Sequence, residues 1–222
     1  MQRTVLILVG LLALSTLLAG DNSQDQEEDI PLIDQIQGSP TPEQLISLEA
    51  NTTLISGIGT PDANGTFPDS LATIFKGSFK NLEGHGYALE LGQDDTAFSA
   101  YAGLLPSTDP GPLPLQGIAA MHGTYNVIEV GKSDGERRDF AEPETTTGRI
   151  TLRADFRFNT LQGSDDTLKV DGEFSGNTVT GEVFFNARPA TLAGRLGSDH
   201  AVGVFHGNDD VTAYIGGFLV ER

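Results

Sequence analysis

Cysteine is absent from the sequence. Without it the chain can form no disulfide bond, no thiolate nucleophile and no zinc site ligated by sulfur. Tryptophan is also absent and only two residues are methionine, whereas 27 of the 222 residues are glycine. This composition suits a sheet with many bends better than a helical bundle. The fold must therefore depend on its sheet and its apolar core alone.

Basic residues are scarce. The chain has 13 Lys and Arg against 31 Asp and Glu, which gives a formal net charge of -18. Phosphate backbones and anionic lipids are bound by basic surfaces, so this charge argues against nucleic acid and against a polybasic membrane patch. A basic protein or a cation stays compatible with the charge, and the simplest role of the charge is solubility.

Motifs of the common enzyme classes are missing as well. The sequence contains no Gly-x-Ser-x-Gly elbow, no His-Glu-x-x-His pair and no phosphate-binding loop. The carboxylates of Asp155, Glu173 and Glu182 fall on the wet face of predicted strands, where such groups usually serve solubility and strand register. The sequence therefore predicts a protein that is not an enzyme.

Residues 1–20 have a short basic start, an apolar run and small residues at the end, which predicts a bacterial-type export signal peptide. Leu18-Ala19-Gly20 resembles the end of a lipoprotein signal, but Asp21 stands where such signals have the acylated cysteine. We therefore expect an exported protein of the periplasm, or of the outer membrane and cell surface, without that lipid anchor. Residues 21–48 are acidic and contain prolines, which predicts a flexible spacer.

The clearest structural element lies between Leu168 and Phe185. Apolar residues or glycines alternate with polar ones on both sides of Gly176-Asn177, which is the period of strands with one dry and one wet face. Gly-Asn supplies the positive φ angles of a two-residue hairpin turn. This segment predicts a β-hairpin.

Further strands are predicted on both sides of this hairpin. After Phe156 the chain either turns early, at 157–160, or continues to Phe158, and we favour the early turn. Together the strands predict an all-β fold with one closed antiparallel barrel of about eight strands over residues 85–222, preceded by a loosely structured part of the same domain at 49–84. The predicted strands are 85–91, 97–103, 116–130, 150–156, 161–163, 191–195, 201–206 and 214–220.

Five short, glycine-based motifs follow one another in a set order. They are Gln116–Tyr125, Ala154–Phe156, Gly172–Gly181, Gly203–Gly207 and Gly216–Phe218. In this order they resemble the β-barrel domain of the transferrin-binding protein B-like surface lipoproteins, a group with factor H-binding and haem-scavenging members. Two features depart from that family: Phe205-His206-Gly207 replaces its usual Phe-Tyr-Gly, and the insert 208–215 is longer and lacks a glutamate.

The resemblance implies a non-enzymatic binding protein that uses loops at a barrel rim to bind an extracellular or periplasmic protein, or the cargo of such a protein. Transferrin binding itself is not implied, because the chain has room for one barrel and little else. The alternative is a carrier of a small ligand, with haem or a metal held in the barrel mouth. The residues expected to bind the ligand are His122, Tyr125, His206 and Tyr214.

The spacing of the four histidines predicts no metal site and no resident cofactor, because no two of them stand at ligand spacing on one element. Three turns share the pattern Gly-x-Asp-Asp, at 92–95, 163–166 and 207–210. Paired carboxylates bind calcium in some loops, but these three lack the further oxygen ligands. Asp and Gly are also what hairpin turns require, so turn formation is the favoured interpretation, with an acidic barrel mouth as the alternative.

Overall fold

The computed structural model describes residues 53–94, 97–131, 143–209 and 212–222. The predicted signal peptide at 1–20 and the acidic spacer at 21–48 lie outside these residues. The described chain contains twelve strands and no helix. Within it, therefore, no helix is long and apolar enough to cross a membrane.

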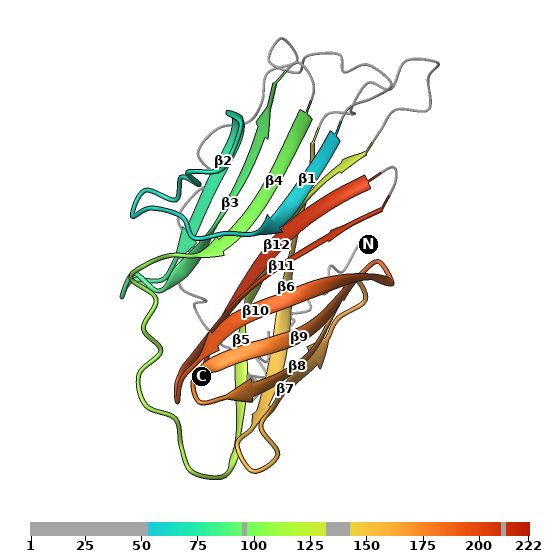
Figure 1. The fold of residues 1–222 in the computed structure, drawn as a ribbon. Helices are drawn as coiled ribbons and strands as arrows, with labels where there is room; N and C mark the ends of the chain where they lie inside the picture. Colours follow the sequence, from blue (N-terminus) through green and yellow to red (C-terminus); the bar gives the residue numbers. More distant parts are fainter. Residues whose placement is uncertain (1–52, 95–96, 132–142, 210–211) are drawn as a thin grey trace, which may run out of the picture.

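Eight consecutive strands close into an antiparallel barrel (Figure 1). Each strand pairs with the next along the chain, and the last pairs with the first. The all-β class and the eight-stranded barrel are thus confirmed. The strands are β5 (Ile118–Gly131), β6 (Glu144–Asp155), β7 (Thr160–Ser164), β8 (Leu168–Ser175), β9 (Thr178–Phe185), β10 (Arg188–Leu196), β11 (His200–Asn208) and β12 (Thr212–Glu221).

The predicted hairpin is formed by β8 and β9. Leu168 lies opposite Phe185 and Ser175 opposite Thr178, so that two residues make the turn, and Gly176 has a φ of 53°. Strand β8 alternates strictly between buried and exposed residues, as its sequence predicts. The early turn after Phe156 is also confirmed, because β6 ends at Asp155 and β7 begins at Thr160.

The barrel begins at Ile118, and the strands predicted at 85–91 and 97–103 belong to a second sheet instead. That sheet has the order β1-β4-β3-β2, with β1 parallel to β4, and it also takes in the segment predicted to be loosely structured. Both faces of β3 are buried, and the barrel strand β12 is likewise buried on both faces over 213–220, so the burial pattern of a strand does not tell which of the two sheets it joins. The strands are β1 (Thr53–Ile58), β2 (Ala72–Lys80), β3 (Gly86–Gln93) and β4 (Ala97–Leu104).

The second sheet packs against the outside of the barrel, alongside β11 and β12 (Figure 1). Tyr87 of β3 is fully buried in this interface, and its ring lies against the backbone of Gly217 on β12. The amide of Asn126 on β5 donates a hydrogen bond of 2.9 Å to the Tyr87 hydroxyl oxygen. Burial raises the pKa of this hydroxyl well above its usual value.

The barrel interior is filled by side chains from its own wall. Four of its aromatic rings share one arrangement, because each lies over a glycine directly opposite on the neighbouring strand. A Cβ atom added to any of these glycines would lie within 3.0 Å of the ring, so no other residue fits. The pairs are Tyr125 with Gly148, Phe205 with Gly216, Phe218 with Gly203 and Tyr214 with Gly207.

We expect Gly203→Ala to destabilise the protein by about 1–3 kcal/mol, because the new methyl group would overlap the buried Phe218 ring. Thermal unfolding should show a fall of roughly 2–4 °C for each kcal/mol. Gly57→Ala is the matched control, since a Cβ there would make an ordinary contact of 3.6 Å with Tyr101. Equal melting temperatures of the two variants would contradict the packing argument.

Candidate functional site

The two histidines predicted to bind a ligand lie outside the barrel. His122 on β5 is exposed, and its Nδ1 is 2.9 Å from the hydroxyl oxygen of Thr151 on β6. His206 on β11 is half-buried under the second sheet, where its Nδ1 is 3.4 Å from the Ser56 hydroxyl oxygen of β1. Burial lowers the pKa of His206.

The two tyrosines point the other way, into the barrel core. The Tyr125 hydroxyl donates a hydrogen bond of 2.8 Å to Asp165, and burial together with this bond raises its pKa to about 12. The Tyr214 hydroxyl donates to the carbonyl oxygen of Pro189, and the Arg188 guanidinium lies 4.7 Å from the centre of the Tyr214 ring. The structure therefore separates the four predicted residues by the barrel wall and does not bring them into one site.

The three Gly-x-Asp-Asp turns use their first aspartate in the same way. The Oδ1 atoms of Asp94, Asp165 and Asp209 accept hydrogen bonds from the backbone N–H groups three residues further on, at distances of 2.6–2.7 Å. The backbone N–H of each aspartate also donates to the carbonyl oxygen of that later residue. The interpretation as hairpin turns is confirmed, because these carboxylates close the turns.

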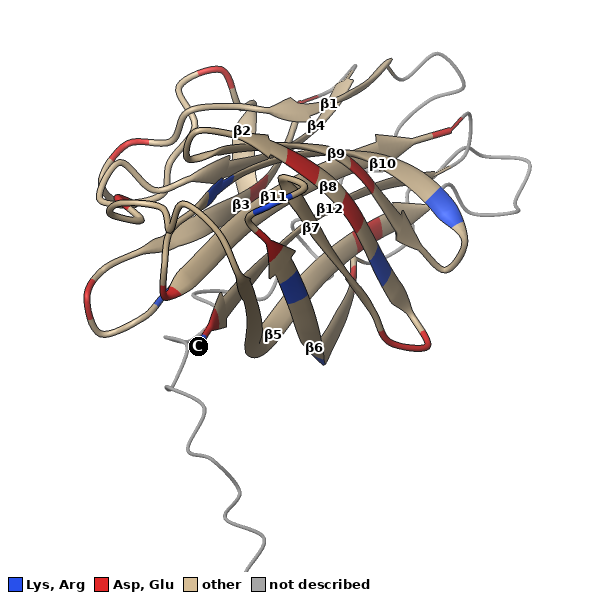
Figure 2. Ribbon diagram, turned by 90° about the horizontal axis from the view of Figure 1, so that it is seen from below, with Lys and Arg blue, Asp and Glu red and all other residues tan. Residues whose placement is uncertain are grey.

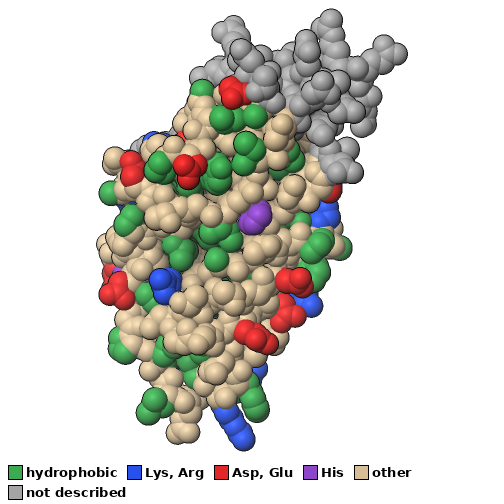
Figure 3. Space-filling view, in the orientation of Figure 1, with side chains coloured by type: hydrophobic (Ala, Val, Ile, Leu, Met, Phe, Trp, Pro, Cys, Tyr) green, Lys and Arg blue, Asp and Glu red, His purple; other side chains and the backbone are tan. Residues whose placement is uncertain are grey.

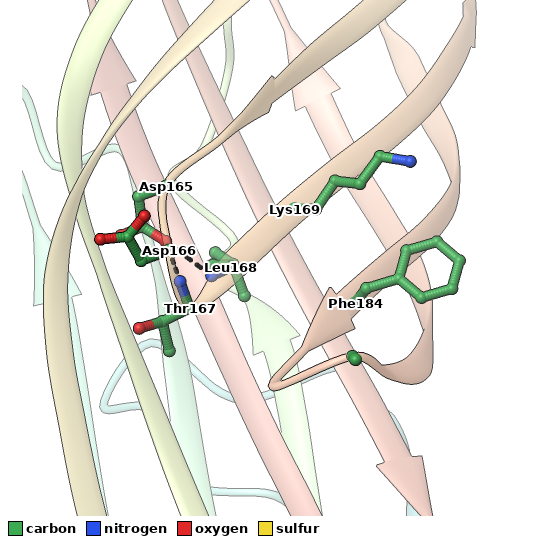
Figure 4. Close-up of a pocket in the computed structure, with 7 residues that line it drawn as sticks. Asp165, Asp166, Thr167, Leu168, Lys169 and Phe184 are labelled. Carbon is green, nitrogen blue, oxygen red and sulfur yellow. Dashed lines mark hydrogen bonds between the residues drawn. The ribbon is translucent and has the colours of Figure 1, made fainter.

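A pocket of about 320 Å³ lies beside the middle turn of these three (Figure 4). Lys169 and Phe184 extend away from Asp165 and Asp166 in Figure 4, and the Lys169 ammonium is 5.3 Å from the centre of the Phe184 ring. Asp165 already closes the turn, and Lys169 extends toward the Phe184 ring. The polar groups of the pocket therefore do not converge on one position for a ligand. The lining residues are Asp165, Asp166, Thr167, Leu168, Lys169, Phe184 and Ala187.

The opposite end of the barrel carries an exposed apolar cluster. Leu115 is 98% exposed, Phe158 66% and Ile118 56%. Arg157 is also exposed, and its guanidinium carbon lies 5.2 Å from the centre of the Phe158 ring. We call these four residues the rim patch. Hydrophobic and basic side chains protrude at this lower end of the molecule in Figure 3.

Two neighbouring segments hold the rim patch in place. Ile118 pairs with Asp155, and the Phe156 N–H donates to the Gly117 carbonyl oxygen, so the start of β5 lies beside the β6–β7 turn. Buried Asp155 accepts hydrogen bonds from the backbone N–H groups of Arg157 and Phe158. Arg157 and Phe158 therefore project from a turn that the buried carboxylate closes, beside the start of β5.

The loop before β5 is also attached to the barrel, by a hydrogen bond and by an apolar contact. The Asn177 amide donates a hydrogen bond of 2.7 Å to the Gly111 carbonyl oxygen, and Leu113 packs against the barrel core. The sequence analysis located the turn at 157–160 but did not assign the rim patch. An apolar ring in a turn, where polar residues are usual, is the signal that could have identified it.

No protein-family model matches the chain, and no curated protein matches its sequence. Solved structures do match. A surface lipoprotein structure has a TM-score of 0.42 at 15% identity, and the match covers 62% of this chain and 74% of that one. Transferrin-binding protein B from Haemophilus parasuis Hp5 has a TM-score of 0.42 at 13% identity over 68% of this chain. The haemoglobin receptor HpuA from Kingella denitrificans has 0.33 at 14% identity, with coverages of 65% and 67%.

The match covers 37% of the transferrin-binding protein B chain, which is less than half its length.

Stability should fall as the pH rises from 10 towards 12. In that range the Tyr125 hydroxyl of the unfolded chain, with an ordinary pKa of 10.0, loses its proton, while the folded protein keeps it. The raised pKa thus contributes stability below pH 10 that is lost at higher pH, on the order of 1 kcal/mol. Urea unfolding at a series of pH values measures this loss.

Tyr125→Phe should show a shallower decline over the same pH range, because phenylalanine has no proton to lose. His122→Ala is the control, since His122 is exposed on the same strand and lies outside the barrel core. Parallel declines for wild type and Tyr125→Phe would show that Tyr125 does not contribute.

Proposed function

We propose that this chain is an exported binding protein, not an enzyme, and that it binds another protein through the rim patch at one end of its barrel. The observation that carries the proposal is that Leu115, Ile118 and Phe158 are all exposed at one end of the barrel, on segments that hydrogen bonds to buried Asp155 and half-buried Asn177 tie to the barrel. Large apolar side chains exposed together at a fixed position are typical of an interaction surface.

The residue types of the rim patch support this role. Aromatic residues and arginine contribute most of the binding energy in protein interfaces, and Phe158 with Arg157 beside it provides both. Complete burial of the Phe158 side chain in a partner would contribute about 1.5–3 kcal/mol to the binding free energy. Backbone that is already ordered adds no further entropy cost on binding.

The surroundings indicate what kind of partner fits. The net charge of -18 attracts basic proteins over long range, while apolar side chains make the contact itself. Figure 2 looks onto this end and shows acidic positions on the surrounding loops. The partner is therefore an extracellular or periplasmic protein that has an apolar pocket within a basic surface.

The filled barrel interior favours this role over that of a small-ligand carrier. The aromatic rings and glycines of the wall occupy the lumen, and Tyr125 and Tyr214 already have hydrogen-bond partners. A haem titration should therefore give no Soret shift. A shift that His122→Ala or His206→Ala removes would favour the carrier instead.

The double variant Leu115→Ser/Phe158→Ser tests the proposal. Surface plasmon resonance against a panel of extracellular proteins should find a partner whose affinity falls at least about 100-fold in the variant, because two anchors are lost. Haemoglobin belongs in the panel, since one of the similar structures is HpuA in complex with human haemoglobin.

Leu82→Ser is the matched control, because Leu82 is exposed but lies on the β2–β3 turn outside the rim patch. Both variants should melt within a few degrees of wild type, as exposed positions usually change stability by no more than about 0.5 kcal/mol. A partner that binds the double variant as tightly as wild type would rule out the rim patch as its site.

A further inference from the structure

Two histidines that are far apart in the sequence meet where the second sheet joins the barrel. His85 follows the β2–β3 turn and His200 begins β11, and their rings stack with centres 4.3 Å apart and planes 16° apart. Glu83 lies on the same turn, with its Oε2 atom 3.2 Å from Nε2 of His85. One ligand atom from each of the three residues lies within 4.8 Å of the other two.

His200 supplies a second observation that points to a ligand at this position. The residue is only 7% exposed, and its Nε2 atom is buried without a hydrogen-bond partner. A buried polar atom without a partner costs free energy, and almost all such atoms in folded proteins are satisfied. A bound ion would satisfy this nitrogen.

His85 contacts the loop before β5 through one ring nitrogen and Glu83 through the other. Its Nδ1 atom accepts a hydrogen bond of 3.2 Å from the Asp109 backbone N–H, which places the ring proton on Nε2, 3.2 Å from the Glu83 carboxylate. To bind a metal ion through Nε2, the ring must move this proton to Nδ1 and give up the bond from Asp109. The Ser107 carbonyl oxygen, 3.3 Å from Nδ1, can then accept the proton, and a backbone carbonyl behind the ligating ring is a common second contact in metal sites.

We propose that Glu83, His85 and His200 form a binding site for a divalent transition-metal cation of the Zn²⁺ type, with a fourth position open to water. Two imidazole nitrogens and one carboxylate oxygen suit zinc and its neighbours, whereas calcium and magnesium prefer oxygen ligands. The site does not depend on the rim patch or on the proposed partner.

The three residues must move a little to hold the ion. Zinc–ligand distances of about 2.1 Å place tetrahedral ligand atoms roughly 3.4 Å apart. Glu83 and His85 are already 3.2 Å apart, whereas the three ligand atoms together lie only within 4.8 Å of one another. Glu83 is exposed on the turn and is free to approach, and the two rings must tilt from their parallel stack so that their lone pairs converge. The bound cation would then join the β2–β3 turn to the barrel, beside the hydrogen bond of 2.5 Å between Asn81 and Glu221.

Isothermal titration calorimetry of the metal-free full chain with Zn²⁺ tests this site. We expect one tight site per chain, and a rise in melting temperature of roughly 5–10 °C at a zinc concentration about 100 times Kd. His85→Ala and His200→Phe should each weaken binding by more than about 100-fold, because even changes behind the ligands cost 10–100-fold. Glu83→Gln should weaken binding as well.

His122→Ala and His206→Ala are the matched controls, and both should bind zinc as wild type does. His200→Phe keeps a ring in the stack, so its melting temperature without metal shows whether it folds. Should it not fold, His85→Ala and Glu83→Gln on the turn decide the question. Zinc binding that survives these changes, or only weak binding at several sites, would overturn the proposal in favour of adventitious binding to the acidic surface.

Discussion

The contact between an aromatic ring and the glycine directly opposite it is the packing constraint on which the barrel depends. A small barrel has little internal volume, and a ring fits only where the facing strand has no side chain. Tyr125 over Gly148 shows the arrangement between β5 and β6, and Phe218 over Gly203 shows it between β11 and β12. Because the rings fill the lumen, the surfaces left for recognition are the outer wall and the two rims.

The same contact joins the second sheet to the barrel wall. The two consecutive glycines of β12 face opposite ways, with Gly216 under Phe205 inside and Gly217 under Tyr87 outside. The second sheet thereby covers the outer wall along β11 and β12, which leaves the remaining outer wall and the barrel ends exposed. Its β2–β3 turn also brings His85 onto His200, so this packing creates the proposed cation site.

Some features of the candidate site follow from strand alternation and turn residues in the sequence, whereas others depend on contacts between distant segments. His122 and Tyr125 stand three positions apart on one strand, so alternation puts them on opposite faces, and in the structure His122 lies outside the barrel and Tyr125 in its core. The turn that carries Phe158 was predicted, but the exposure of its ring depends on Asp155 and on the loop before β5. No sequence pattern predicted that His85 stacks on His200, because this contact forms only when the second sheet packs against the barrel.

The sequence by itself determined the all-β class, the β8–β9 hairpin and the three Asp-closed turns, since these depend on a period of two residues and on side chains within a few positions of each other. Only the tertiary structure decided that β3 and β4 leave the barrel for a second sheet, that the rim patch is exposed, and that two distant histidines meet. The reason is physical: alternation tells which face of a strand is dry, but not which strand or sheet covers that face.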